Sequence, residues 1–255
     1  MGYEIVVFLG PTLSVTEAQT HLDALFLPPA GNGDLVRAVI DHAPRAIVLV
    51  DGVFAQSPAV RHKEILWAIS RGVRVYGASS MGAIRAAELE AHGMVGYGMV
   101  FRWYRRTPLA DDADVAVPMA PAQLGSFPLG NALIDMRLTL NKARRAGVIA
   151  PHLAMSLAVL ARRLHYSDRS YAKLLSIAVE NGAASQDLRA LELWLAEGKR
   201  KQKEADAIGL LTYLALNGTP PAGDMEMAGF EPTEAFAYDM AYYDLAHEVL
   251  AAADR

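Results

Sequence analysis

Two adjacent serines, Ser79 and Ser80, stand between a run of β-branched residues and an alanine-rich run in the stretch VYGASSMGAIRAAEL. With Ala78 two positions before it and Gly82 two positions after it, Ser80 fits the pattern of a nucleophile at a sharp strand-to-helix turn, which needs small residues on both sides. The first free amides of the next helix, from Met81 and Gly82, could stabilise an oxyanion. A serine at such a junction also caps helices. The stretch leaves both alternatives open, a nucleophile and a helix cap.

A nucleophilic serine needs a base, and no histidine stands in the usual chain order with an acid beside it. Lysine is the other option, because burial favours the neutral amine, which can accept the serine proton. Lys63, in RHKEILWAI, lies on the expected helix that precedes the strand leading to Ser80. The alternative interpretation of Lys63 is a surface lysine that extends its amine into solvent.

Three short apolar runs rich in β-branched residues predict the strands that must position these side chains. The runs are nearly continuous rather than alternating, which is typical of a parallel sheet covered on both faces. They span residues 4–10, 46–52 and 73–79. Helical patterns at 16–25, 34–42 and 58–70 alternate with them, with Ser57 as N-cap and Gly72 as C-cap of the last. This alternation predicts βαβ units.

Polar and small residues follow the predicted strands, and the carboxyl ends of parallel strands share one edge of a sheet, where ligands bind. Gly10 follows the first strand, and its amide is a further candidate for binding an oxyanion. Asp51, after the second, is expected to orient Lys63, to line the pocket, or to form an Asx turn. Arg85 and Glu88, three apart on one helical face, are expected to pair, either to orient the site or as an ordinary surface ion pair.

The second half of the chain is helix-like throughout, after a stretch at 118–130 that carries proline and glycine. Within residues 94–119, the aromatic residues and the short run at 114–117 predict an extra strand or an irregular segment. Helices are predicted at 131–146, 152–165, 170–180, 186–196, 199–216 and 234–253. The predicted fold class is α/β, with a small, mostly parallel Rossmann-like sheet flanked by helices in the N-terminal half and an all-α C-terminal half. The predicted domains are 1–120 and 121–255.

Composition narrows the possible partners and chemistry. Twenty-four basic and twenty-eight acidic residues give a net charge of −4, which does not indicate nucleic acid or an anionic membrane. No signal peptide or apolar run of membrane-spanning length is evident, so we expect a soluble, cytoplasmic protein. The chain has no cysteine, which excludes disulfides, thiolate zinc sites and a cysteine nucleophile on it. Histidine spacing and glycine motifs predict no metal and no cofactor.

Several short motifs, in order over the first 120 residues, resemble the TfuA family. They are FLGPTL, GDL, VDGVF, HKEIL, GASSMGAIRAAEL followed by GMVGYG, and DDADVAV. Their agreement in order and spacing is far more specific than any single motif. The segment KEADA at 203–207 resembles a second, weaker family segment in the helical half.

The resemblance implies a role in peptide thioamidation, a post-translational modification used in RiPP biosynthesis. TfuA proteins accompany YcaO enzymes, which activate backbone amides of a peptide or protein substrate with ATP. The family is described as hydrolysing a thiocarboxylated, ThiS-like sulfur carrier with a serine and lysine pair, so that sulfur transfer to YcaO follows. Ser80 matches that serine, Lys63 matches the lysine, Lys203 is the competing base, and Ser79 is a cap or second donor. The alternative is a non-catalytic adaptor that binds YcaO and its peptide substrate.

Overall fold

The computed structural model describes residues 4–54, 57–107, 110–219 and 230–253. Its contacts group into two compact units, which are described separately below. The first combines Met1–Pro108 with Asp206–Arg255, and the second is Leu109–Ala205. These bounds differ from the predicted division at residue 120, because the chain leaves the first unit earlier and returns to it at Asp206.

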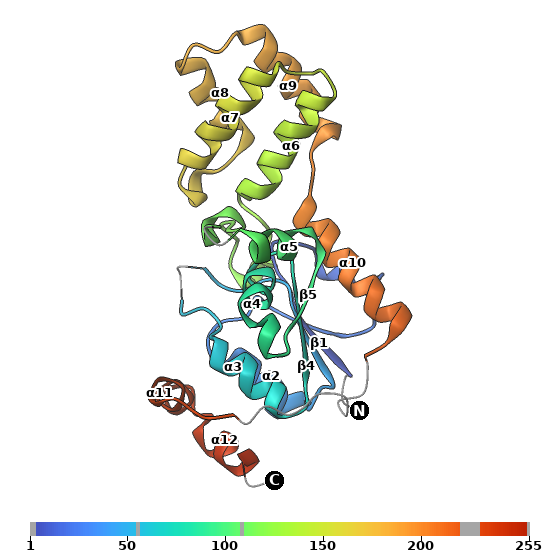
Figure 1. Ribbon diagram of the computed structural model, residues 1–255, viewed down its shortest axis with the longest axis vertical. Helices are drawn as coiled ribbons and strands as arrows, with labels where there is room; N and C mark the ends of the chain where they lie inside the picture. The colour runs from blue at the N-terminus through green and yellow to red at the C-terminus, as the bar shows by residue number, and fades with distance from the viewer. Residues whose placement is uncertain (1–3, 55–56, 108–109, 220–229, 254–255) are drawn as a thin grey trace. The chain divides into compact units, whose positions relative to one another are not determined.

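The first unit is built on a five-stranded sheet in which every strand pair is parallel (Figure 1). The strands are β1 (Ile5–Phe8), β2 (Leu25–Leu27), β3 (Ala46–Leu49), β4 (Arg74–Ala78) and β5 (Val95–Tyr97), in the order β2-β1-β3-β4-β5. The predicted parallel sheet is therefore confirmed, and its three predicted strands are β1, β3 and β4. The edge strand β2 went unpredicted because it has three residues and is only partly buried. The other edge strand, β5, lies within residues 94–119, for which the sequence predicts an extra strand or an irregular segment.

Helices cover both faces of this sheet. In Figure 1, α10 (Gln202–Asn217) runs on one side of the strands, and α3 (His62–Ser70) and α4 (Met81–Leu89) lie on the other. Leu210 and Leu214 of α10 belong to one buried apolar cluster with Val7 of β1, Val48 of β3 and Tyr76 of β4. These strand residues share a face because side chains alternate along a strand.

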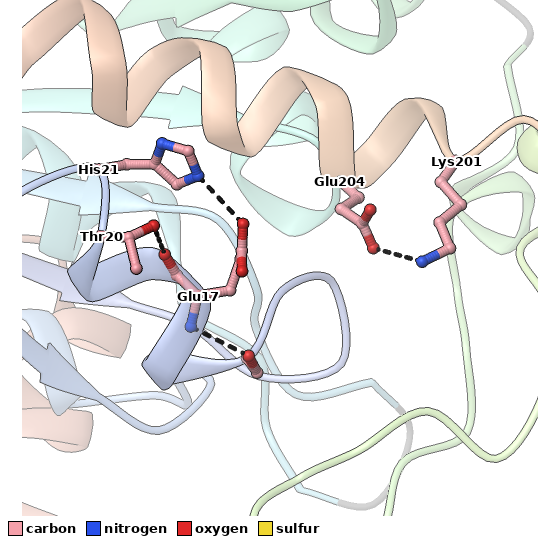
Figure 2. Close-up of polar contacts among 6 residues, drawn as sticks. Glu17, Thr20, His21, Lys201 and Glu204 are labelled. Carbon is pink, nitrogen blue, oxygen red and sulfur yellow. Dashed lines mark hydrogen bonds and ion pairs between the residues drawn. The ribbon is translucent and has the colours of Figure 1, made fainter.

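A serine caps the short first helix, α1 (Val15–Gln19). The Glu17 amide donates to the Ser14 hydroxyl at 3.2 Å, which satisfies one of the free amides at the helix start. Figure 2 shows Glu17 with two further neighbours, the Thr20 hydroxyl that donates to its carbonyl at 2.7 Å and the His21 ring at 3.3 Å from its carboxylate. The helix is shorter than the predicted 16–25, because the chain turns into β2 at Leu25.

The N-terminus of α3 corrects the prediction that a helix begins at residue 58 with Ser57 as its cap. The helix begins at His62, and its N-cap is Arg61. The preceding residues pair with the loop after β2 instead, since the Asn32 amide donates to the Pro58 carbonyl at 2.9 Å and Ala59 bridges to residue 31. At the other end, Gly72 directly follows the C-cap with a φ of 79°, the left-handed conformation that terminates helices.

The second unit is helical, as predicted for this part of the chain. Its main helices are α6 (Leu133–Arg145), α7 (Pro151–Arg163), α8 (Tyr171–Glu180) and α9 (Ser185–Gly198). One leucine-rich core joins them, with Leu140, Leu157, Leu174 and Leu191 almost fully buried. Residues 114–117 form no strand: a short 3₁₀ turn (Asp112–Asp114) ends there.

The C-terminal region corrects the prediction of one helix over 234–253. It consists of α11 (Glu234–Tyr242) and α12 (Ala246–Ala253), separated by a turn in which Asp244 has a φ of 58°. The turn brings Leu245 into the interior, where its amide donates to the Met240 carbonyl at 2.7 Å. Across the described ranges, each helix is too short or too polar to cross a membrane.

Candidate active site at the carboxyl ends of the strands

The turn between β4 and α4 holds the two serines in an unusual backbone conformation. The Ser80 amide donates to the Ala78 carbonyl at 2.8 Å, and Ser79 between them has a φ of 69°. A hydrogen bond across two residues around a positive φ is the form of a rare, strained γ-turn. Strain of this kind costs roughly 1–3 kcal/mol and clusters at functional sites. The predicted sharp strand-to-helix turn is present, with its strain at Ser79.

The Ser80 side chain does not act as a helix cap. Ser80 occupies the N-cap position of α4, and its carbonyl accepts the Ala83 amide at 2.9 Å. Its hydroxyl makes no capping hydrogen bond, in contrast to Ser14 at the start of α1. Ser80 is also only 2% exposed. Capping therefore does not explain the hydroxyl at this position, and a nucleophile there would have to be uncovered before it meets a substrate.

Asp51 organises the loop after β1. Its carboxylate accepts the amides of Gly10 at 2.9 Å and Thr12 at 3.0 Å, and the Thr12 hydroxyl at 2.6 Å. Asp51 follows β3 and is 1% exposed. In a sheet of this strand order, the crevice for ligands lies between β1 and β3, where the strand order reverses. Asp51 thus fixes the backbone at the expected binding position, and among the described residues it makes no hydrogen bond or ion pair with Lys63.

Glycines allow the N-terminus of α4 to press onto the sheet. A Cβ atom at Gly82 would lie 1.7 Å from the Leu49 carbonyl oxygen, and one at Gly77 would lie 2.1 Å from the Gly82 carbonyl oxygen. The Gly82 amide donates to the Val50 carbonyl at 3.3 Å. Of the three amides predicted to bind an oxyanion, those of Gly10 and Gly82 already have acceptors within the fold. Only the Met81 amide has none in the part of the chain that the structure describes.

The Lys63 amine contacts the segment that precedes α11. It donates to the Glu231 carbonyl at 2.8 Å and lies 5.3 Å from the centroid of the Phe230 ring. No hydrogen bond joins Lys63 to Ser80 within the described ranges. The role of Lys63 as the base stays a prediction, and it requires the amine to leave Glu231.

Lys203, the competing base, is buried in the second unit, where its amine donates to the Val115 carbonyl at 2.8 Å. In the same motif, Glu204 pairs with Lys201 at 2.9 Å (Figure 2). Asp206, which belongs to the first unit, accepts the Val100 amide at 2.7 Å near the start of α5 (Gly98–Arg106). The KEADA segment therefore supplies a carboxylate to a helix start, a role that its resemblance alone did not suggest.

Arg85 and Glu88 form the predicted ion pair, with 2.7 Å between guanidinium and carboxylate. The same carboxylate oxygen lies 2.8 Å from the His62 ring, and the Arg85 Nε donates to the Val60 carbonyl at 3.0 Å. Burial opposes ionisation of Glu88, but hydrogen bonds from His62 and Arg85 outweigh it and lower the pKa. The network ties α4 to the start of α3, which fixes the helix that follows Ser80.

Glu64 is a buried carboxyl group that the sequence reasoning missed. It accepts the Gly33 amide at 2.7 Å and the Arg61 amide at 2.9 Å, so it joins the starts of α2 (Asp34–His42) and α3. Burial raises the pKa of Glu64 from 4.5 to about 8, and the nearby Asp239 carboxylate adds to the shift. The available signal was an acidic residue directly before the apolar run ILWAI, on the same expected helix.

Glu64 predicts a pH-dependent stability. Folded Glu64 keeps its proton up to about pH 8, whereas an unfolded glutamate loses it near pH 4.5, so the folded chain binds more protons between these values. The free energy of unfolding should then fall as pH rises through this window, by up to about 1.4 kcal/mol per pH unit from this one group. Urea unfolding at pH 5, 6, 7 and 8 measures the slope. Glu64→Gln should reduce the slope of the free energy of unfolding against pH. An equal slope in both proteins would show that other titratable groups cause the pH dependence.

Comparison with known proteins supports the motif resemblance. The family model for TfuA-like protein matches residues 51–170, a stretch that begins at Asp51 and includes Lys63 and both serines. No curated protein matches the chain. Among the described residues, no group of three or more acidic or histidine side chains is placed to hold a metal ion. The chain therefore contains a TfuA-like domain over residues 51–170, and the resemblance to the TfuA family is confirmed.

Proposed function

We propose that this protein hydrolyses the thiocarboxylated C-terminus of a ThiS-type sulfur carrier and supplies the sulfide to a YcaO enzyme. Its TfuA-like domain supports a role as an accessory protein in thioamidation. The observation that supports hydrolysis most directly is the position of the Ser80 hydroxyl and its lack of a capping hydrogen bond. Its hydroxyl stands at the strand-end edge of the sheet, beside the strained Ser79, and does not cap the helix that it precedes.

The proposed reaction is an acyl transfer through Ser80. The Ser80 oxygen attacks the thiocarboxylate carbon while the Lys63 amine accepts its proton. The C–S bond then breaks, and the lysine proton leaves with sulfur as hydrosulfide. Water hydrolyses the resulting ester, which regenerates Ser80 and releases the carrier with an ordinary carboxylate. The Met81 amide is the proposed donor to the oxyanion, and the lack of an acceptor for it in the described structure supports this choice.

The absence of cysteine determines how sulfur travels. A chain without a thiol cannot hold sulfur as a persulfide. Sulfur must therefore leave as hydrosulfide or pass directly to the partner. The proposal consequently predicts free hydrosulfide when no YcaO is present.

The experiment supplies the purified protein with a thiocarboxylated carrier and measures both products. We expect hydrosulfide in a dye assay and, by mass spectrometry, conversion of the same amount of carrier to its carboxylate. The carrier prepared with an ordinary carboxylate is the control and should release nothing. Release no faster than in buffer alone, with and without YcaO, would contradict the hydrolase proposal.

A non-catalytic adaptor is the second candidate, and two observations favour it. Ser80 is almost fully buried, and the Lys63 amine is bound to the Glu231 carbonyl. An adaptor would stimulate thioamidation by YcaO with sulfide added directly, and it would do so equally well without the Ser80 hydroxyl. The two candidates therefore differ in whether carrier-derived sulfur depends on Ser80.

Burial of Ser80 yields a prediction about access. Because the chain has no cysteine, Ser80→Cys introduces a single thiol whose alkylation by iodoacetamide reports exposure. We expect alkylation at least about tenfold slower than for Ser14→Cys, whose site is exposed, since a buried thiol reacts only after local opening. Adding the carrier should accelerate the reaction if it opens the site. Equal rates for the two variants would show that Ser80 is open without any partner.

A further inference from the structure

The loop between β2 and α2 is clamped by its backbone at the carboxyl edge of the sheet. Three consecutive amides have protein acceptors: Gly31 donates to Asp34 at 2.7 Å, Asn32 to the Pro58 carbonyl at 2.9 Å, and Gly33 to Glu64 at 2.7 Å. The backbone on both sides of Asn32 is therefore held in place. A side chain on such a support is positioned before any ligand arrives.

The side-chain oxygen of Asn32, unlike these three amides, has no partner in the described part of the chain. Asn32 is 6% exposed, and its Oδ1 atom is buried with no hydrogen-bond donor among the described residues. A buried acceptor without a donor is costly, and each such group calls for an explanation. The amides of Gly31, Asn32 and Gly33 all have acceptors within the fold, so the missing donor to the Asn32 oxygen points to a molecule outside it.

The position of Asn32 places it beside the proposed site. The Ala30 amide donates to the Asp51 carbonyl at 3.0 Å, and the Val53 amide donates to the Ala30 carbonyl at 3.0 Å, so the loop pairs directly with the segment after β3. A Cβ atom at Gly52 would meet both the Ala30 carbonyl oxygen at 3.1 Å and the Met81 side chain at 2.8 Å. The loop that carries Asn32, the residues after Asp51 and the start of α4 thus converge at one edge.

We infer that the Asn32 side-chain oxygen accepts a hydrogen bond from a backbone N–H of the carrier's C-terminal tail. This inference rests on the proposed function, since it assigns the substrate to the same edge as Ser80. An extended peptide tail brings N–H donors next to its terminal thiocarboxylate, whereas the thiocarboxylate itself brings only acceptors. A rigid acceptor at the same edge of the sheet as the nucleophile holds the tail in register, which makes Asn32 a substrate-binding residue.

The test measures affinity separately from hydrolysis. In a Ser80→Ala background, which cannot consume the substrate, the dissociation constant of a thiocarboxylated ThiS-type carrier is compared with and without Asn32→Leu. Leucine has the same branched arrangement of side-chain heavy atoms and no acceptor, so we expect about tenfold weaker binding. Urea unfolding should show unchanged or higher stability, because the variant removes a buried unsatisfied group. Asn217→Leu, at the exposed end of α10, is the matched control and should leave affinity unchanged.

A second probe needs no change at Asn32. Two short peptides ending in a thiocarboxylate, one with its last peptide nitrogen methylated, are bound to the Ser80→Ala protein. Methylation should weaken binding about tenfold there and add no further loss to Asn32→Leu, because both changes remove the same bond. Unchanged affinity in Asn32→Leu, or full additivity of the two losses, would overturn the inference while sulfide release still supported the proposed function. Failure of any thiocarboxylate to bind or be hydrolysed would overturn both.

Discussion

Replacing Ser80 by alanine is expected to stop hydrosulfide release from a thiocarboxylated carrier, with a loss of about 10³-fold or more. Without the hydroxyl no acyl-enzyme forms, and only the weaker effects of binding and amide donors remain. The same change should alter the free energy of unfolding by less than about 0.5 kcal/mol, because the hydroxyl makes no capping bond that alanine would remove. Single-turnover sulfide release and urea unfolding on the same preparation measure the two effects.

Ser14→Ala is the matched control for this experiment. Ser14 does cap its helix, so its replacement should cost about 1 kcal/mol of stability and leave sulfide release intact. The two variants are thus expected to show opposite effects. Ser80→Ala should lose sulfide release and keep its stability, whereas Ser14→Ala should lose stability and keep its sulfide release. Undiminished release from Ser80→Ala, with the carrier still converted, would exclude Ser80 as the nucleophile. Thioamidation that continues with carrier-derived sulfur would then favour the adaptor.

The central strands could be predicted because each is buried, and a buried strand has a nearly continuous run of apolar residues in its own short segment. β1 and β3 are short runs of apolar residues, many of them β-branched, and β4 is nearly continuous and apolar after Arg74, which is typical of buried strands in a parallel sheet. β2 and β5 have only three residues each and gain their strand conformation from the neighbour they pair with. A strand whose conformation depends on pairing with a strand elsewhere in the chain cannot be recognised from its own three residues.

The candidate site was predicted in part for a similar reason. Ser79, Ser80 and Asp51 could be placed at one edge because strand ends in a parallel sheet converge there. Contacts between residues far apart in the sequence could not be anticipated. Examples are the hydrogen bond from Lys63 to the Glu231 carbonyl and the one that Asp206 accepts from the Val100 amide. Each depends on where the chain returns after more than a hundred residues, which spacing within a motif does not encode.

Asn32 and Glu64 show a different limit. Glu64 lies within HKEIL, a segment that resembles the TfuA family, and Asn32 directly precedes another, GDL. Sequence alone ranks serine and lysine first, because their chemistry is familiar in hydrolases. The structure distinguishes the other two by burial: Glu64 satisfies two amides, whereas the Asn32 oxygen has no donor.

Gly82→Ala is expected to produce the largest loss of stability, about 4 kcal/mol or more. The added methyl group would lie 1.7 Å from the Leu49 carbonyl oxygen, and that oxygen belongs to the backbone of a central strand, so it cannot move aside as a flexible side chain would. The N-terminus of α4 would have to lift from the sheet, with loss of the bond from the Gly82 amide to the Val50 carbonyl. Urea unfolding, or the yield of soluble protein if none folds, measures the effect.

Gly31→Ala is the matched control, because it lies at the same edge of the sheet and an added Cβ would find its nearest atoms at 3.4 Å or beyond. Its stability should stay within about 1 kcal/mol of the parent protein. If Gly82→Ala instead folds with stability close to the parent, α4 does not rest against β3 at this point. The close contact between Gly82 and β3 would then not be what holds the turn that carries Ser80. The position of this turn next to the segment of Asp51 would need another explanation.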